Sequence, residues 1–181
     1  VGKVISALDE AGLRDKTIII FTSDHGFHLG EHDFWAKVSL LDESSQVPLI
    51  ISVPGKKPAV CHSLTELLDL YPTISSLCEL PKQPHLQGKD ISKMLDDPKH
   101  TVREAAFSVA PFRQGFLLRE DDWSYIQYGE DASKGIELFD VRKDPKQYTN
   151  LAKDTAYEKV VKRFKNQMAL KLREVRDNDL N

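Results

Sequence analysis

The sequence predicts an α/β fold, in which part of a parallel sheet flanked by helices is followed by a small antiparallel sheet and a C-terminal helix. Two apolar, β-branched runs, residues 17–21 and 47–53, are typical of strands buried on both faces, as in a parallel sheet covered by helices. Between residues 104 and 141 the pattern changes to short strands separated by turn residues, which favours hairpins. The 181 residues suffice for one domain or two small ones.

The first half should contain two helices. Apolar residues at i, i+3, i+4 and i+7 spacing predict an N-terminal helix that ends at Gly12; they are Val1, Val4, Ile5 and Leu8. Residues 64–80 also have helical spacing, and Pro72 is expected to kink or split that helix. Residues 81–98 are rich in proline, lysine and aspartate and should connect two halves, so we expect a division into residues 1–98 and 99–181.

The second half should form a small subdomain of antiparallel strands and one long helix. The predicted strands are residues 104–109, 115–119, 123–128 and 136–141. One apolar stripe predicts the C-terminal helix and should face the core: Tyr157, Val160, Val161, Phe164, Met168, Leu172 and Val175.

Composition excludes several classes of function. With a net charge of −3, the chain gives no reason to propose nucleic acid or an anionic membrane as a partner. No apolar run approaches the roughly 20 residues of a membrane span. Cys61 and Cys78 are too few for a disulfide framework and are expected to be buried free thiols. The chain begins with Val1 rather than methionine, which suggests a partial chain whose compartment cannot be read from its first residues.

Ionisable residues gather directly after the first predicted strand. In open α/β sheets ligands bind beyond the carboxyl ends of the strands, and Asp24 and His25 lie at such an end. Gly26 would let the backbone turn sharply there. Asp24 offers a hard carboxylate for a divalent cation and His25 an imidazole, but a metal needs at least two further groups.

Three other residues of this stretch leave alternatives open. His28 and His32 have i, i+4 spacing, but Gly30 between them makes a zinc-binding pair the less favoured interpretation. Lys37 is either an ordinary exposed lysine or a cation directed at an anionic substrate, and composition alone favours the former.

Four segments resemble one known family. The run "TIIIFTSDHGFHLGEHDFWAK" followed by "VPLIISVPG" is similar to the C-terminal half of sulfatases, in the alkaline-phosphatase-like superfamily, and most similar to the iduronate-2-sulfatase group. "TELLDLYPTISSL" and "ELFDVRKDPKQYTNLAKD" match later family segments in the expected order. The resemblance covers most of the chain.

The resemblance implies roles for particular residues. Asp24 corresponds to a carboxylate ligand of the family's calcium ion, and His25 to the neighbouring ligand position or a hydrogen-bond partner of a sulfate oxygen. Lys37 corresponds to the lysine that contacts the sulfate ester, where a cation offsets developing negative charge. Arg113 is a further candidate for substrate binding, with an exposed surface arginine as the alternative.

The chain also departs from the family pattern. It lacks the Cys/Ser-x-Pro-x-Arg motif that yields the formylglycine nucleophile and the early Asp-Asp metal pair. We therefore expect the C-terminal part of a sulfatase that is inactive alone, because an N-terminal half supplies the nucleophile and shares the calcium. The implied substrate is a sulfated small molecule or glycan, and the implied destination is periplasmic, extracellular or lysosome-like.

Two other interpretations remain. A zinc phosphohydrolase of the same superfamily also places Asp-His-Gly after a strand, although Trp-Ala-Lys and the tail segment favour a sulfatase. A non-catalytic binding or scaffold module is the alternative from a different class.

Overall fold

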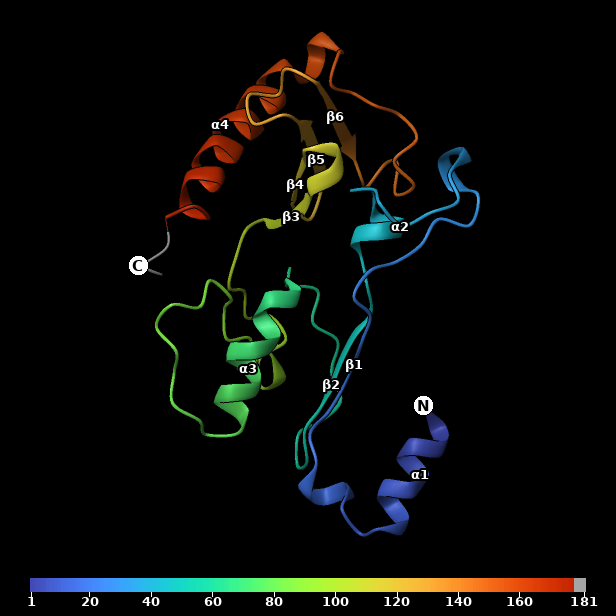
Figure 1. Cartoon of the computed structure of the whole chain (residues 1–181), viewed down its shortest axis with the longest axis vertical. Helices are drawn as coiled ribbons and strands as arrows, with labels where there is room; N and C mark the ends of the chain where they lie inside the picture. Colours follow the sequence, from blue (N-terminus) through green and yellow to red (C-terminus); the bar gives the residue numbers. More distant parts are fainter. Residues whose placement is uncertain (178–181) are drawn as a thin grey trace.

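The computed structural model describes residues 1–177, apart from the side chain of Arg113. Figure 1 shows an elongated arrangement with α1 at one end and α4 near the other. In chain order the elements, joined by loops and short 3-10 turns, are α1 (Gly2–Glu10), β1 (Ile19–Thr22), α2 (Asp42–Ser45), β2 (Leu49–Ser52), α3 (Leu70–Leu77), β3 (Ala106–Ala110), β4 (Gly115–Arg119), β5 (Trp123–Tyr128), β6 (Gly135–Asp140) and α4 (Glu158–Glu174).

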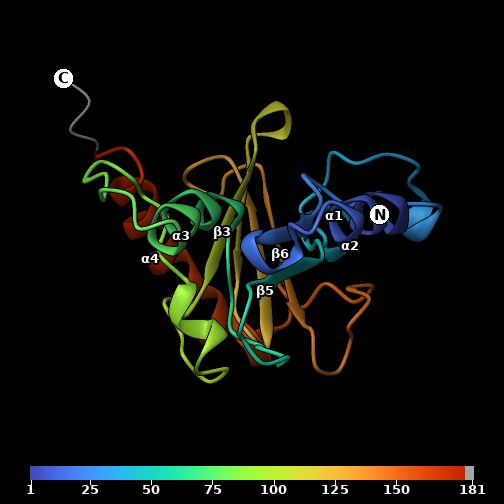
Figure 2. The same ribbon diagram turned by 90° about the horizontal axis from the view of Figure 1, so that it is seen from below.

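The second half is a four-stranded antiparallel sheet in the order β3-β4-β5-β6. Neighbouring residues of one strand face opposite sides, so Leu117 and Leu118 belong to different cores. One face packs on α4 through Phe164, and the other packs on Leu40, which precedes α2. Figure 2 shows α4 and α2 on opposite sides of the sheet. The α/β class with a terminal antiparallel sheet and helix is therefore confirmed.

The pairing of the first two strands corrects the prediction. β1 and β2 are antiparallel, with Ile19 opposite Ser52 and Thr22 opposite Leu49, where a parallel sheet was expected. An apolar, β-branched run indicates burial on two faces but not strand direction, and mixed sheets with an antiparallel edge strand are common. The division of the chain between residues 98 and 99 stays a prediction.

The helix around Pro72 also differs from expectation. α3 begins at Leu70 after a 3-10 turn (Leu67–Asp69), so Pro72 lies in its first turn and neither kinks nor splits it. A proline there lacks only an N–H that has no partner inside the helix. The two thiols are free as predicted, but neither is buried: Cys61 is half-buried, and Cys78, just past the end of α3, is exposed.

Residues 81–98, predicted as a connector, pack onto the protein. Ile91 and Met94 are buried there. Asp69 is fully buried and binds this segment through the backbone N–H of Lys89 at 2.7 Å, while its carboxylate also pairs with Arg103. The connector is thus tied to both α3 and the strand region that follows.

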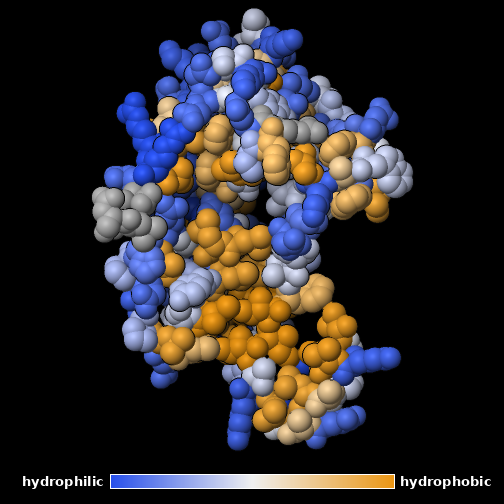
Figure 3. All heavy atoms as spheres, viewed as in Figure 1, coloured by the Kyte–Doolittle hydropathy of each residue, from blue (hydrophilic) through white to orange (hydrophobic). Residues whose placement is uncertain are grey.

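The N-terminal helix α1 ends where predicted, but it has no face buried against the rest of the protein. Gly12 has a φ of 65° just after α1, a conformation that glycine adopts without strain. No residue of the expected apolar stripe is buried: Val4 is 72% exposed, and Ile5 and Leu8 are half-buried. Figure 3 shows hydrophobic residues gathered over the part of the molecule that holds β1, β2 and α1. Within residues 1–177, no helix combines the length and apolar character needed to cross a membrane.

Candidate active site

A close backbone contact shapes the loop after β1. The N–H of Gly26 donates to the carbonyl oxygen of Ser44 at 2.9 Å. A Cβ at Gly26 would lie 2.0 Å from the carbonyl oxygen of Glu43, so any other residue would push the two segments apart. Glycine is needed here because two backbones approach closely, rather than for an unusual φ.

This loop brings Asp24, His25 and Lys37 together. The Nζ of Lys37 lies 2.8 Å from Nε2 of His25, and Nε2 lies 3.3 Å from Oδ2 of Asp24. The other ring nitrogen, Nδ1, lies 2.8 Å from the carbonyl oxygen of Gly26. Because a carbonyl can only accept, Nδ1 carries the proton, and in the neutral ring Nε2 is left to accept from the Lys37 ammonium.

The electrostatics keep Asp24 ionised. Desolvation raises the pKa of this carboxyl, but hydrogen bonds from its own backbone N–H and that of His25, the charge of Lys37 and, when its ring is protonated, that of His25 lower the pKa below its usual value. The Asp24 side chain is 83% exposed. The site thus presents an accessible carboxylate beside an imidazole and an ammonium group.

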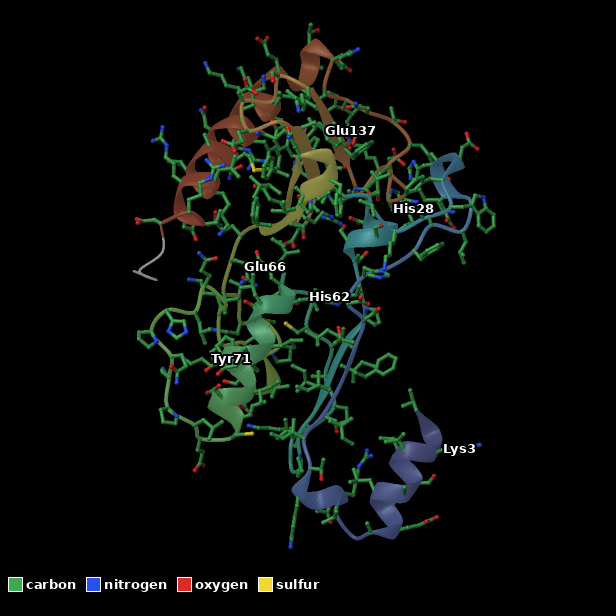
Figure 4. The ribbon with its side chains drawn as sticks, viewed as in Figure 1. Lys3, His28, His62, Glu66, Tyr71 and Glu137 are labelled. Carbon is green, nitrogen blue, oxygen red and sulfur yellow. The ribbon has the colours of Figure 1, made fainter. Side chains whose placement is uncertain are left out.

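These residues line a cleft of about 780 Å³ between the β1 segment and the four-stranded sheet. Thr22, Asp24, His25 and Lys37 line the cleft together with residues of β3 and of the turn after it. His62 and Glu66 also line the cleft, and Figure 4 shows both between the β1–β2 pair and the sheet. Sequence reasoning missed these two, because single polar residues in a loop carry no periodicity or motif.

Arg113 is the last residue of a 3-10 turn (Pro111–Arg113) between β3 and β4. Pro111 and Phe112 line the same cleft, and Phe112 is 91% exposed. The side chain of Arg113 lies outside the described part of the structure, so its role in substrate binding stays a prediction.

The donor set fits a calcium ion only in part. Calcium takes 6–8 oxygen ligands. Within the described residues, no group of three or more His, Cys, Asp or Glu side chains could hold a metal ion. Asp24 supplies one hard oxygen ligand. Nε2 of His25 is the only ring position not used by a carbonyl, and it already faces Lys37.

His28 and His32 adopt different roles from a zinc-binding pair. Their rings meet edge to face with centroids 5.8 Å apart. Nε2 of His28 is hydrogen-bonded to the Ser39 hydroxyl at 2.8 Å, and the His32 ring lies over Tyr148 at 4.7 Å. Both rings are therefore part of the packing behind the cleft.

The fold is that of an α/β core of the alkaline-phosphatase-like type, as comparison with solved structures shows. A solved enzyme in complex with its substrate D-glucosamine-2-N,6-O-disulfate superimposes with a TM-score of 0.82 and 26% identity over 98% of this chain and 38% of that one. The phosphonate monoester hydrolase of Agrobacterium radiobacter superimposes with a TM-score of 0.79 and 27% identity over 98% of this chain and 39% of that one.

The family follows from the sequence comparison. The family described as N-sulphoglucosamine sulphohydrolase, C-terminal, matches residues 30–174, and the chain belongs to it. Arylsulfatase K of Gallus gallus is 34% identical over 164 residues, which cover 84% of this chain and 31% of that protein. The chain thus spans about a third of the length of such relatives.

Proposed function

We propose that the chain is the C-terminal portion of a sulfatase that hydrolyses sulfate esters. The observation that carries the proposal is the contact of Lys37 with His25, beside Asp24, at the wall of one cleft in a member of a sulphohydrolase C-terminal family. An N-terminal portion, corresponding to the length by which the relatives exceed this chain, would supply the formylglycine nucleophile.

Lys37 is the proposed catalytic cation. Its ammonium has three N–H donors, of which one is directed at Nε2 of His25. The other two can reach the oxygens of a sulfate ester bound in the cleft. As the ester bond breaks, negative charge grows on the leaving oxygen, and a fixed positive charge stabilises it more than it stabilises the ground state.

His25 is proposed to orient Lys37, and in its protonated form the ring can instead donate from Nε2 to a sulfate oxygen. The bond to the Gly26 carbonyl fixes the ring orientation and leaves Nε2 facing the cleft. Metal ligation by His25 would need the same Nε2 and would release Lys37. Asp24 is therefore the better proposed calcium ligand of the two, and the remaining ligands would belong to the N-terminal portion. When bound, the calcium ion would attract the sulfate oxygens into the cleft.

For the substrate, we propose a sulfated sugar, as in the iduronate-2-sulfatase group that the sequence motifs resemble. A disulfated glucosamine is the substrate named for one structural neighbour, which supports this class. Arg113 is proposed as a substrate contact from the turn beside Phe112. Export from the cytoplasm is proposed on the family resemblance. The likeness to a phosphonate monoester hydrolase makes phosphonate or phosphate esters the second candidate substrates.

The test is a comparison of Lys37→Met with Lys159→Met in the polypeptide that joins this chain to its N-terminal portion. Lys159 is exposed on α4, on the face of the sheet away from the cleft. We expect Lys37→Met to lower kcat/KM for an aryl sulfate about 10²- to 10³-fold, the effect of removing one group that stabilises developing charge. Lys159→Met should leave it unchanged.

Two results would contradict the proposal. Equal activity of the two lysine variants would remove Lys37 from the chemistry. Turnover of an aryl phosphonate or phosphate with none of the aryl sulfate would instead assign the second candidate substrates.

A further inference from the structure

We propose that His28 is a positioning residue for Lys37: it holds the chain on both sides of that lysine and so directs the ammonium group toward His25. The proposal rests on the proposed function of Lys37 and assigns part of that function to a residue that lies outside the cleft lining.

His28 contacts the segment both before and after Lys37. Its backbone N–H donates to the carbonyl oxygen of Ala36 at 2.9 Å. Its ring Nε2 is hydrogen-bonded to the hydroxyl of Ser39 at 2.8 Å. The N–H of Ser39 in turn donates to the carbonyl oxygen of Lys37 at 3.0 Å. One residue thus fixes the backbone immediately around Lys37.

The His28 ring is buried and can therefore restrict the movement of the backbone around Lys37. His28 is 0% exposed, and its ring meets Phe34 edge to face with centroids 5.2 Å apart. Figure 4 shows His28 beside α2, deep within the loop. A fully buried ring cannot swing into solvent, so the contact with Ser39 persists while the exposed Lys37 side chain moves.

The polar character of the ring points to this role rather than to packing alone. Among the described residues, Nδ1 of His28 has no hydrogen-bond partner although it is buried. A leucine would fill much of the same space without leaving a buried nitrogen unsatisfied. Nε2, the ring nitrogen that does have a partner, is bonded to Ser39. A residue that is unfavourable for stability at its own position is expected where it serves a functional site.

Lys37 needs such support because its own side chain is flexible. A lysine has four rotatable side-chain bonds, and the 2.8 Å contact with His25 holds only the tip. A backbone free to shift by about 1 Å would misplace the ammonium group, and shifts of this size can lower a catalysed rate by about 10²-fold.

The experiment uses His28→Leu and His28→Gln in the full polypeptide that carries the N-terminal portion. His28→Leu removes the ring nitrogens, whereas the amide of His28→Gln can reach the Ser39 hydroxyl. We expect His28→Leu to lower kcat for an aryl sulfate about 10- to 100-fold. His28→Gln should recover most of this loss, and Ser39→Ala should reproduce it without adding to it in the double variant.

The same substitution made in the Lys37→Met variant distinguishes positioning of Lys37 from general destabilisation of the fold. If His28 acts through Lys37, then His28→Leu has no further effect on kcat once Lys37 is replaced by methionine. A residue that merely supports the fold would lower kcat in both backgrounds by the same factor, and that result would overturn the proposal.

A labelling experiment tests the same inference without activity. Acetic anhydride is applied to the full wild-type polypeptide and to its His28→Gln and Ser39→Ala variants, and acetylation of Lys37 relative to Lys159 is followed by mass spectrometry. Release of Lys37 in Ser39→Ala should change its relative rate several-fold, with His28→Gln near wild type. Unchanged labelling in Ser39→Ala would overturn the proposal. If the wild-type enzyme hydrolyses no sulfate ester, the proposed function fails, while the labelling result still decides whether His28 positions Lys37.

Discussion

Replacement of Asp69 by alanine should be among the most destabilising single changes in the chain. The buried Asp69 carboxylate accepts the N–H of Glu66 at 2.8 Å and the N–H of Lys89 at 2.7 Å. It also forms a two-pronged ion pair with the guanidinium of Arg103. Glu66 completes the cluster, because it lies 3.4 Å from Nε of Arg103 and accepts the N–H of Phe107 at 2.8 Å.

The magnitude follows from what Asp69→Ala leaves behind. Removing one partner of a buried ion pair costs about 3–5 kcal/mol when the other charge stays buried. In Asp69→Ala the buried guanidinium of Arg103 loses its two-pronged partner and keeps only the longer contact with Glu66. Two backbone N–H groups also lose their acceptor. Since these losses share one site and do not add, we expect about 4 kcal/mol, close to a 10³-fold change in the unfolding equilibrium. With a urea slope of about 2 kcal/mol/M, the midpoint should fall by about 2 M.

The assay is urea unfolding of the 181-residue chain followed by far-ultraviolet circular dichroism. Asp96→Ala is the matched control, because Asp96 forms an exposed ion pair with Lys56 at 2.5 Å, and exposed pairs contribute little. A midpoint shift in Asp69→Ala no larger than that in Asp96→Ala would refute the reasoning.

Three further predictions concern the metal ligand, alkaline pH and association. Asp24→Asn should weaken calcium binding by the intact enzyme in calorimetric titration, since a charged oxygen ligand is lost, and an unchanged affinity would remove Asp24 from the calcium site. Burial raises the pKa of the Tyr125 hydroxyl. At a pH above about 10 the folded state therefore keeps the hydroxyl proton, whereas the unfolded state loses it. Stability should therefore fall as pH rises past about 10, and Tyr125→Phe should flatten the dependence of Tm on pH above about 10; identical curves would contradict this. The chain by itself should associate, because Phe21 and Ile50 on the β1–β2 pair are 41% and 59% exposed, and light scattering should report a smaller mass for Ile50→Lys. A monodisperse monomer for the unaltered chain would speak against an open sheet surface.

The second half of the fold was predictable because its signals are local. Residues 115–119 and 123–128 were expected as strands and are β4 and β5. Alternating apolar residues and the turns between them depend on neighbours within a few positions. The stripe on α4 likewise predicted a core-facing side, and Phe164, Met168 and Leu172 are buried there. These signals need no knowledge of distant contacts.

The first half was harder because its organisation depends on contacts between distant residues. The direction of β2 against β1 is set by the chain between them, not by their composition. The need for Gly26 arises from Glu43, seventeen positions later, and no local pattern shows that approach. Asp24 and His25 were candidates from their position after the first strand, whereas Lys37 became one through the family resemblance, and the structure brings the three together. Their catalytic and metal-binding roles stay predictions.

The four-stranded sheet of the second half helps to hold the proposed site in place. Leu40, three positions after Lys37, is buried against the face of the sheet that α4 does not cover. Asp42 is tied to the same half twice, through Arg119 of β4 at 3.1 Å and through the side chain of Gln147, which accepts its N–H at 2.8 Å. These contacts fix the end of the Lys37 loop, while His28 fixes its middle. A substitution such as Gln147→Leu would leave the N–H of Asp42 without its acceptor, so the proposed sulfatase activity should depend on residues of the C-terminal half that lie outside the cleft.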